Sequence, residues 1–443
     1  MISEHKRARK IEPVNTPVTD KRKSITAISL VLALGFVVNY VDRGNISVVA
    51  PLLQREFSIN STHLGLLFSS FIFTYALMQI PAGYLVDRFR LKWLYAGAFI
   101  WWSLSNAAIA FASGFGSLLI LRMLLSIGES ISLPASSKIL ASTFQEHERG
   151  IANGILDSGY KFGPAIGVFF GGIFIAHFGW RNLFLLTGFG ALLWLIPWLW
   201  IADSIADPKQ STSPISAPVK VHALLSTKDI CLSTRAWGTF IGNFCGGYVW
   251  YLLLSWLPTY LVTQRHMNLT NMGIFGSLLF GVTGITSVCT GLLTDRLIRK
   301  GRSPGRVRLG FMVAGLLLSG FLVPAGFAKS STAALGFLFL AFAAYGMFSC
   351  NVWAATQSIA GPQNIGRWAG IQNSLGNLGG VASPALTGWI VTVTGSFHWA
   401  FLTAAVFMVL GAITYIFVVK SLEPISVAIS PEQVVSRPCE PEE

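Results

Sequence analysis

The sequence predicts an all-α integral membrane protein, with twelve transmembrane helices in two pseudo-symmetric six-helix bundles. Three observations predict this fold class: a shortage of charged residues, a recurrence of long apolar segments, and a repeat between the two halves of the chain. Only 12% of the 443 residues are charged and 53% are hydrophobic, whereas about a quarter of the residues of a soluble domain are charged. Lipid must therefore be part of this protein's solvent.

Apolar segments of the roughly 20 residues needed to cross a bilayer recur along the chain. A polar stretch that contains three prolines separates the first six segments from the last six. The expected domains are a cytoplasmic tail (1–25), a bundle (26–202), a cytoplasmic linker (203–234), a second bundle (235–420) and a cytoplasmic tail (421–443). The apolar segments lie at about 26–50, 62–85, 93–113, 115–142, 150–176, 182–202, 235–262, 271–293, 307–328, 332–358, 367–393 and 397–420.

Basic residues gather on one side of this topology. The net charge of +13 is concentrated in the N-terminal tail, in the loop after the second segment and in the loop after the eighth. Such short basic loops mark the cytoplasmic side of a membrane protein. Both termini are therefore expected in the cytoplasm, in a multi-pass protein of the cell (inner) membrane. Because the charge lies in membrane loops, nucleic-acid binding is excluded.

Two sequence echoes relate the halves of the chain. The run Gly83-Tyr-Leu-Val-Asp87-Arg88 recurs as Gly291-Leu-Leu-Thr-Asp295-Arg296, each directly after the second apolar segment of its half. A second echo relates the glycine-rich segments 154–163 and 370–379. Six segments repeated in one orientation are typical of a transporter built from two parallel halves, with its site at their interface.

The loop run after the second segment resembles the loop signature of the major facilitator superfamily, and its recurrence in the second half supports the resemblance. We interpret these residues as a gate latch. Gly83 allows helix ends to approach, and Asp87 pairs with the other half only when the cytoplasmic side is shut. The alternative is a loop placed by its positive charge alone. The expected gating residues are Gly83, Asp87, Arg88, Asp295 and Arg296.

Other segments resemble the anion:cation symporter family of that superfamily, across about residues 25–420. The resemblance implies a secondary active transporter, not an enzyme, that takes up sugar acids such as hexuronates, aldonates or aldarates with a cation gradient. The segments are Asn39-Tyr40-Val-Asp42-Arg43, Arg122 with Gly128-Glu129 and Pro134, Gly179-Trp180-Arg181, Trp256-Leu-Pro258-Thr-Tyr260-Leu261, and Asn373 with Gly376-Asn377.

Charged residues lie inside the first-half segments, where each is costly unless it faces a cavity and a partner. Asp42 and Arg122 are expected roughly 12 Å and 10 Å from the outer ends of their helices, so they could form an ion pair. Glu129, seven residues after Arg122, is expected on the same face near the midplane. Arg43 and Arg122 would then select an anion, while Asp42 and Glu129 carry protons. The alternative is a purely structural ion pair.

Lys161 departs from the pattern of the anion:cation symporters. It follows Asp157 by four residues, a favourable helical spacing for an ion pair. Lys161 therefore either holds a second carboxylate or a polar head group, or it neutralises Asp157. The second echo aligns Asp157 with Asn373 and Lys161 with Asn377, so both pairs are expected to face the centre of the molecule.

Aromatic and amide side chains complete the predicted substrate site. Tyr and Trp are also common packing residues in membrane helices. Only the resemblance therefore favours some of them over the others as substrate-binding residues. The expected substrate-binding residues are Tyr40, Arg43, Tyr75, Arg122, Tyr160, Lys161, Trp353, Asn373 and Asn377, with Trp250 and Tyr251 as weaker candidates.

The sequence thus predicts uptake of a small organic anion by proton symport with alternating access. We expect no cofactor, metal or nucleotide site, and a protein that works as a monomer in the lipid bilayer. Sodium coupling remains an open alternative, because carboxylates bind either ion. The rival functions are a drug or cation exporter of the same fold and a membrane sensor that transports nothing.

Overall fold

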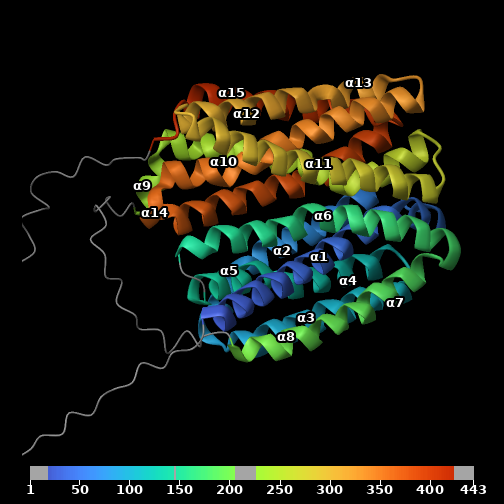
Figure 1. Cartoon of the computed structure of the whole chain (residues 1–443). Helices are drawn as coiled ribbons and strands as arrows, with labels where there is room; N and C mark the ends of the chain where they lie inside the picture. Colours follow the sequence, from blue (N-terminus) through green and yellow to red (C-terminus); the bar gives the residue numbers. More distant parts are fainter. Residues whose placement is uncertain (1–17, 144–145, 205–225, 424–443) are drawn as a thin grey trace, which may run out of the picture.

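The computed structural model describes residues 18–143, 146–204 and 226–423, and their regular structure is helical throughout (Figure 1). The predicted all-α membrane fold is confirmed. Parts of both predicted tails and of the predicted linker lie outside the described residues. They are residues 1–17 of the predicted N-terminal tail, residues 205–225 of the predicted linker and residues 424–443 of the predicted C-terminal tail.

The first half of the chain forms helices close to the predicted segments. Its fourth segment breaks directly after Glu129, because the chain turns through Ser130 before the helix resumes. The helices are α1 (Val18–Glu56), α2 (Ser61–Arg88), α3 (Leu91–Ala108), η1 (Ile109–Phe111), α4 (Phe115–Glu129), α5 (Ser132–Thr143), α6 (Glu146–Phe178), α7 (Trp180–Ala191), η2 (Leu192–Trp194), α8 (Leu195–Ile201) and η3 (Ala202–Ser204).

The second half repeats this arrangement after the short helix α9. Its longest helix, α14, joins two predicted segments across Gly361, whose backbone is not helical (φ 69°, ψ 167°). The helices are α9 (Thr227–Leu232), α10 (Thr234–Thr259), η4 (Tyr260–Gln264), α11 (Leu269–Arg299), α12 (Pro304–Leu318), η5 (Ser319–Phe321), α13 (Leu322–Phe327), α14 (Ser331–Thr394), α15 (His398–Ile413) and η6 (Thr414–Val419).

Within the described residues, eleven helices are long and apolar enough to cross a membrane. They match every predicted span except the one at 367–393, which forms the second part of α14. This part carries Gln372, Asn373 and Asn377 and packs beside α10 and α2. Its polar residues lower its hydropathy.

The predicted internal repeat is visible in the helix packing. On α6, a Cβ added at Gly163 would lie 2.5 Å from Tyr40 Cβ on α1. On α14, the equivalent Gly379 packs against the backbone of Phe244 on α10. The loops that follow these two helices each turn at a glycine with positive φ, Gly179 (79°) and Gly395 (68°). Each half therefore packs its fifth span on its first through glycines.

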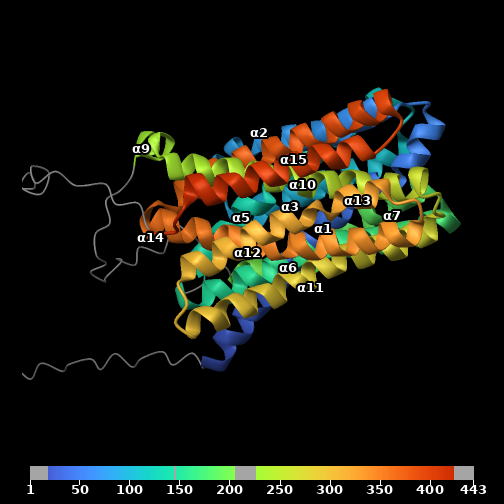
Figure 2. The same ribbon diagram turned by 90° about the horizontal axis from the view of Figure 1, so that it is seen from above.

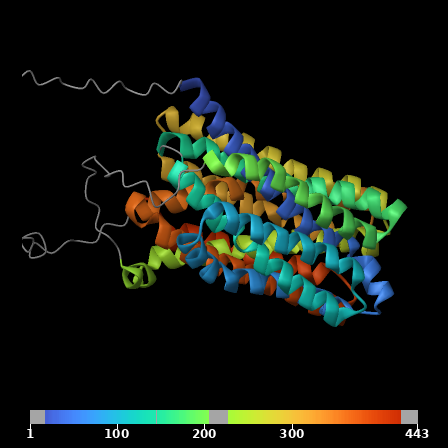
Figure 3. The same ribbon diagram turned by 90° about the horizontal axis from the view of Figure 1, so that it is seen from below.

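The two halves lie side by side, with α6 of the first half against α11 of the second (Figures 1 and 2). Figure 3 shows the opposite face, where the helices of the first half lie in front. At one end of the molecule, which we call the closed end, glycines let the backbones of the halves touch. Gly172 faces Gly273 between α6 and α11, and Gly65 faces Gly388 between α2 and α14. Thr62 adds a hydrogen bond from its backbone N to Thr392 Oγ1 at 2.9 Å.

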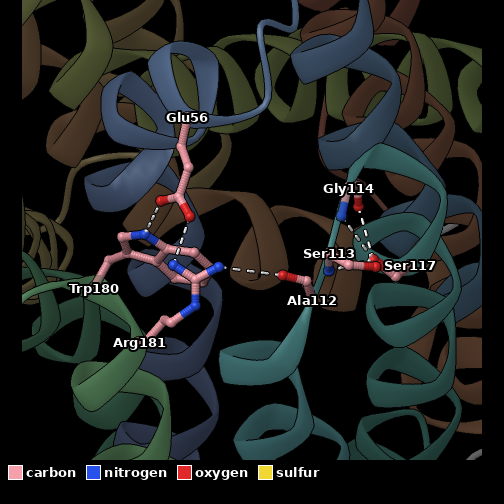
Figure 4. Close-up of polar contacts among 7 residues, drawn as sticks. All are labelled: Glu56, Ala112, Ser113, Gly114, Ser117, Trp180 and Arg181. Atoms are coloured by element: carbon pink, nitrogen blue, oxygen red, sulfur yellow. Dashed lines mark hydrogen bonds and ion pairs between the residues drawn. The ribbon is translucent and has the colours of Figure 1, made fainter.

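A polar clamp ties three helix ends of the first half together at the closed end (Figure 4). Glu56, at the end of α1, accepts hydrogen bonds from Trp180 Nε1 at 2.6 Å and Arg181 Nη1 at 2.5 Å. Arg181 also donates to the Ala112 carbonyl at 3.4 Å. The Gly179-Trp180-Arg181 segment thus fixes the start of α7 to the ends of α1 and η1.

The opposite end, which we call the open end, carries the loops after α2 and α11. Gly83 and Gly291 lie there, and a Cβ added at either one would meet nothing within 4 Å. Closer to the middle of the molecule, Asn373 Nδ2 donates to Gln79 Oε1 at 3.3 Å and so joins α14 to α2. The described contacts between the two bundles thus run from the closed end to the middle of the molecule.

Candidate functional site

A buried ion pair lies at the centre of the first half. Arg43 Nε on α1 is 2.9 Å from Glu129 Oε2, at the end of α4. Both side chains are almost fully buried, at 5% and 0% exposed. Removing one partner of such a pair would leave an uncompensated charge in a low-dielectric interior, which is strongly destabilising.

Aromatic rings surround the guanidinium of Arg43. Its Cζ atom lies 4.4 Å from the ring centre of Tyr75, 4.8 Å from that of Tyr40 and 5.3 Å from that of Phe71. Its Nη1 also donates to the Tyr40 hydroxyl at 3.4 Å. Ring faces attract a cation, so these side chains hold Arg43 in place.

Arg122, predicted to pair with Asp42, instead lies over the Phe71 ring at 4.3 Å. Its Nε and Nη1 are buried and make no hydrogen bond to the described residues. It remains within electrostatic range of both Asp42 and Glu129. The site therefore contains a buried guanidinium with donors to spare.

The predicted Asp42–Arg122 ion pair is wrong for this structure. Asp42 Oδ1 accepts a hydrogen bond from Asn106 Nδ2 on α3 at 2.8 Å. Adjacent residues of a helix point about 100° apart. Arg43 therefore turns toward Glu129 on α4, while Asp42 turns toward α3.

A neutral network supports Asp42, and the sequence analysis missed it. Asn106 Nδ2 also donates to Thr187 Oγ1 on α7 at 3.0 Å, and Asn45 Nδ2 donates to the same hydroxyl at 3.1 Å. Isolated amides and hydroxyls in apolar helices give little signal in a sequence. Only the spacing of Asp42 and Asn45, three residues apart on one helix face, points to this network.

Lys161 on α6 is buried, with 7% of its surface exposed. Its Nζ donates to Ser349 Oγ on α14 at 2.9 Å, so the bond crosses from one half to the other. The same atom lies 5.1 Å from the Tyr160 ring centre and 6.0 Å from that of Trp250. Sequence reasoning missed Ser349, and the side chain of Asp157 lies outside the described residues.

A row of aromatic rings links the halves beside Lys161. Tyr40 meets Tyr160 edge to face at 4.5 Å, Tyr160 stacks on Trp250 at 5.6 Å, and Trp250 stacks on Tyr345 at 5.7 Å. The first two rings belong to the first half and the last two to the second half. Tyr345 was not predicted, because one tyrosine in an apolar segment looks like any packing residue.

The predicted second-half residues lie around this row, with one at a distance. Asn377 is buried, and its Oδ1 accepts a hydrogen bond from the Tyr251 hydroxyl at 3.4 Å. Asn373 contacts Gln79 of the first half. Trp353 lies one turn after Ser349 on α14 and exposes 42% of its surface, so it is not part of the buried cluster.

The predicted gating residues lie together at the open end but do not join the halves. Asp87 Oδ1 is 3.0 Å from Lys138 Nζ of α5, within its own half, and its side chain is 79% exposed. Arg88 donates to the Tyr84 hydroxyl at 3.0 Å. Asp295 and Arg296 are exposed, and neither forms an ion pair with another described residue. Lys138 was not predicted.

The model of the family described as "Major Facilitator Superfamily" matches residues 32–384. A "D-galactonate transporter" of Escherichia coli is 28% identical, over 93% of this chain and 99% of its own. A "Probable galactarate/D-glucarate transporter" of Bacillus subtilis is also 28% identical, over 92% of this chain and 94% of its own.

Among solved structures, the chain is similar to the crystal structure of a bacterial homologue of the human lysosomal transporter Spinster, in an inward-facing and occupied conformation. The TM-score is 0.76 at 19% sequence identity, over 89% of this chain and 97% of that one. At this identity the likeness concerns the fold alone.

Proposed function

The chain belongs to the Major Facilitator Superfamily, and we propose that it imports a small organic anion, a sugar acid, by proton symport with alternating access. It is a multi-pass membrane transporter and not an enzyme. The galactonate and galactarate/glucarate transporters that it resembles over nearly its whole length support the sugar-acid class. They are consistent with the resemblance to the anion:cation symporters.

The buried Arg43–Glu129 pair carries the proposal. A substrate carboxylate that reaches Arg43 competes with Glu129 for the same guanidinium, because both are anions that accept its N–H donors. Once Arg43 turns to the substrate, Glu129 is left buried with less compensation and takes up a proton. Substrate and proton then favour each other's binding, and this coupling is reciprocal.

Two features favour Arg43 over Arg122 as the direct anchor of the anion. Arg43 contacts Tyr40 and Tyr75 and is within electrostatic range of Tyr251 from the second half. Arg122 interacts with Phe71, Asp42 and Glu129, which all belong to the first half. In our proposal Arg122 therefore supplies a positive electrostatic field near Arg43. It stabilises whichever of the two carboxylates, Asp42 or Glu129, stays ionised.

The basic loops support a cytoplasmic position for the open end and both termini, in the cell (inner) membrane. In our proposal the structure is then an inward-facing state, in which Asp87 has a partner within its own half. In the outward-facing state, Asp87 would pair across the halves. We expect one chain to be sufficient for transport, because the proposed site lies between the two halves of a single chain.

Uptake into proteoliposomes tests the function directly. The purified chain should accumulate radiolabelled galactonate, galactarate or a hexuronate when the lumen is more alkaline than the bath, and a protonophore should abolish the accumulation. Accumulation driven by a sodium gradient at equal pH would instead show that sodium is the coupling ion. Transport of organic cations alone would favour the exporter, and absence of any flux would favour a sensor.

A further inference from the structure

Lys161 is a buried cation of the site, and its described partners are all uncharged. Its ammonium meets one hydroxyl, that of Ser349, and two ring faces. Among the described side chains, no carboxylate lies within ion-pair distance of it. A buried ammonium is costly unless an anion accompanies it for part of the transport cycle.

The charges around the site leave a place for such an anion. The buried side chains Arg43, Arg122 and Lys161 are three cations, and Asp42 and Glu129 are two carboxylates. When Glu129 is protonated, the described cluster carries two positive charges more than negative ones. A substrate with two carboxylates neutralises that excess, whereas a substrate with one carboxylate leaves a buried positive charge.

Two of the buried cations, Arg43 and Lys161, each lie near one ring of the Tyr40–Tyr160 pair. Arg43 lies 4.8 Å from the Tyr40 ring, the Tyr40 and Tyr160 rings lie 4.5 Å apart, and Lys161 lies 5.1 Å from the Tyr160 ring. Arg43 and Lys161 are thus separated by no more than a path over two aromatic rings. An extended six-carbon chain with a carboxylate at each end has a comparable length.

From this arrangement we infer that Lys161 is a second carboxylate anchor, which makes the carrier select sugar acids with two terminal carboxylates over those with one. The inference rests on the proposed function and names its substrate class. Arg43 binds one end of the dianion and Lys161 the other, with the Tyr40–Tyr160 pair along the carbon chain. The carboxylate at Lys161 takes the place of Ser349, a neutral partner that an anion outcompetes.

The competing explanation is that Lys161 neutralises Asp157, four residues earlier. The two explanations predict different behaviour of a double variant. If Lys161 serves Asp157, then Asp157→Asn with Lys161→Gln restores wild-type selectivity, because both charges are removed together. If Lys161 binds substrate, the double variant lacks the preference for dianions just as Lys161→Gln does.

Galactarate and galactonate are a matched ligand pair, because they share a hydroxylated six-carbon chain and differ only in whether one end is a carboxylate or a hydroxymethyl group. Binding of each to the purified full-length protein is measured by calorimetry. The wild type should bind galactarate at least tenfold more tightly than galactonate. Lys161→Gln, which keeps a donor for Ser349 but no charge, should bring the ratio near one while galactonate affinity changes less than about threefold.

Two controls fix the interpretation. Lys161→Arg keeps the charge and should keep most of the preference, while Lys329→Gln removes an exposed lysine at the closed end and should change neither affinity. A preference that survives Lys161→Gln, an equal loss for both ligands, or a wild type without preference would overturn the inference. In the last case the protein still binds a sugar acid, so the proposed function stands. Absence of binding and transport for every sugar acid would overturn both.

Discussion

Gly163 on α6 lies directly against Tyr40 on α1, so that a Cβ at position 163 would lie 2.5 Å from the Cβ of the tyrosine. We expect Gly163→Ala to push Tyr40 from its place beside Arg43 and to destabilise the fold by about 1–3 kcal/mol, as overpacking in a filled core does. The unfolding temperature in detergent and the affinity for substrate should both fall. Gly97→Ala on α3 is the control, since that Cβ meets nothing within 4 Å. Equal behaviour of the two variants would contradict the close packing.

Glu129→Gln removes the charge that we propose to be exchanged for a proton. The variant should still exchange labelled substrate across the membrane in counterflow, because the amide mimics the protonated acid. It should lose accumulation driven by a pH gradient. Glu56→Gln is the control, because it alters a paired glutamate of the closed-end clamp away from the interface. If Glu129→Gln still concentrated substrate, Asp42 would be the next candidate for the proton.

Arg43→Lys and Arg122→Lys separate a direct anchor from a supporting charge. A lysine keeps the charge but cannot present the planar set of donors of a guanidinium. We expect Arg43→Lys to weaken substrate binding at least a hundredfold, and Arg122→Lys to weaken it roughly tenfold. Calorimetry on both variants measures the difference. A larger loss at Arg122 would reverse the two roles.

Asp87→Asn distinguishes the proposed latch, a contact of Asp87 with the other half, from the Asp87–Lys138 pair of this structure. The Asp87–Lys138 pair is exposed, so its loss should change the free energy of unfolding by less than about 1 kcal/mol. If Asp87 also pairs across the halves in the outward-facing state, Asp87→Asn should cut uptake severely while binding persists. Lys138→Gln removes only the pair present in this state and should be milder. Equal losses in uptake would assign the function to the Lys138 contact instead.

The topology predicts that Lys329 and Arg302 lie on opposite sides of the membrane. Both are exposed, at the two ends of the span Pro304–Phe327. In a background without the five native cysteines, a cysteine at position 329 should react with an impermeant reagent added to whole cells. A cysteine at position 302 should react only after the cells are opened. The same accessibility at both positions would refute the proposed orientation.

Much of the fold follows from periodicity and repetition. Apolar segments of membrane length predict the spans, and the glycine echo predicts that Gly163 and Gly379 occupy equivalent places. The break at Gly361 falls between the predicted segments 332–358 and 367–393, whereas the break after Glu129 lies inside the predicted segment 115–142. The chain stays helical through Pro258, because a proline in a packed membrane helix is tolerated when its neighbours satisfy the backbone.

The sequence proposed residues for the site but did not predict how they pair. Depth along a helix brought Asp42 and Arg122 to one level, but rotation about the helix axis decides which side chains meet. In the structure, Arg43 pairs with Glu129, and Asp42 accepts a hydrogen bond from Asn106. Ser349 lies 188 residues after its partner Lys161, and no local pattern points to it.

The contact of Gly65 with Gly388 and that of Gly172 with Gly273 give the closed end a seam of backbone. Among the described residues no ion pair crosses this seam, and the hydrogen bond from Thr62 to Thr392 joins neutral groups. Opening there costs dispersion contacts and a neutral hydrogen bond, which dissolved salt does not screen. A carrier whose opposite gate uses charged residues would therefore respond to ionic strength on one face of the membrane only.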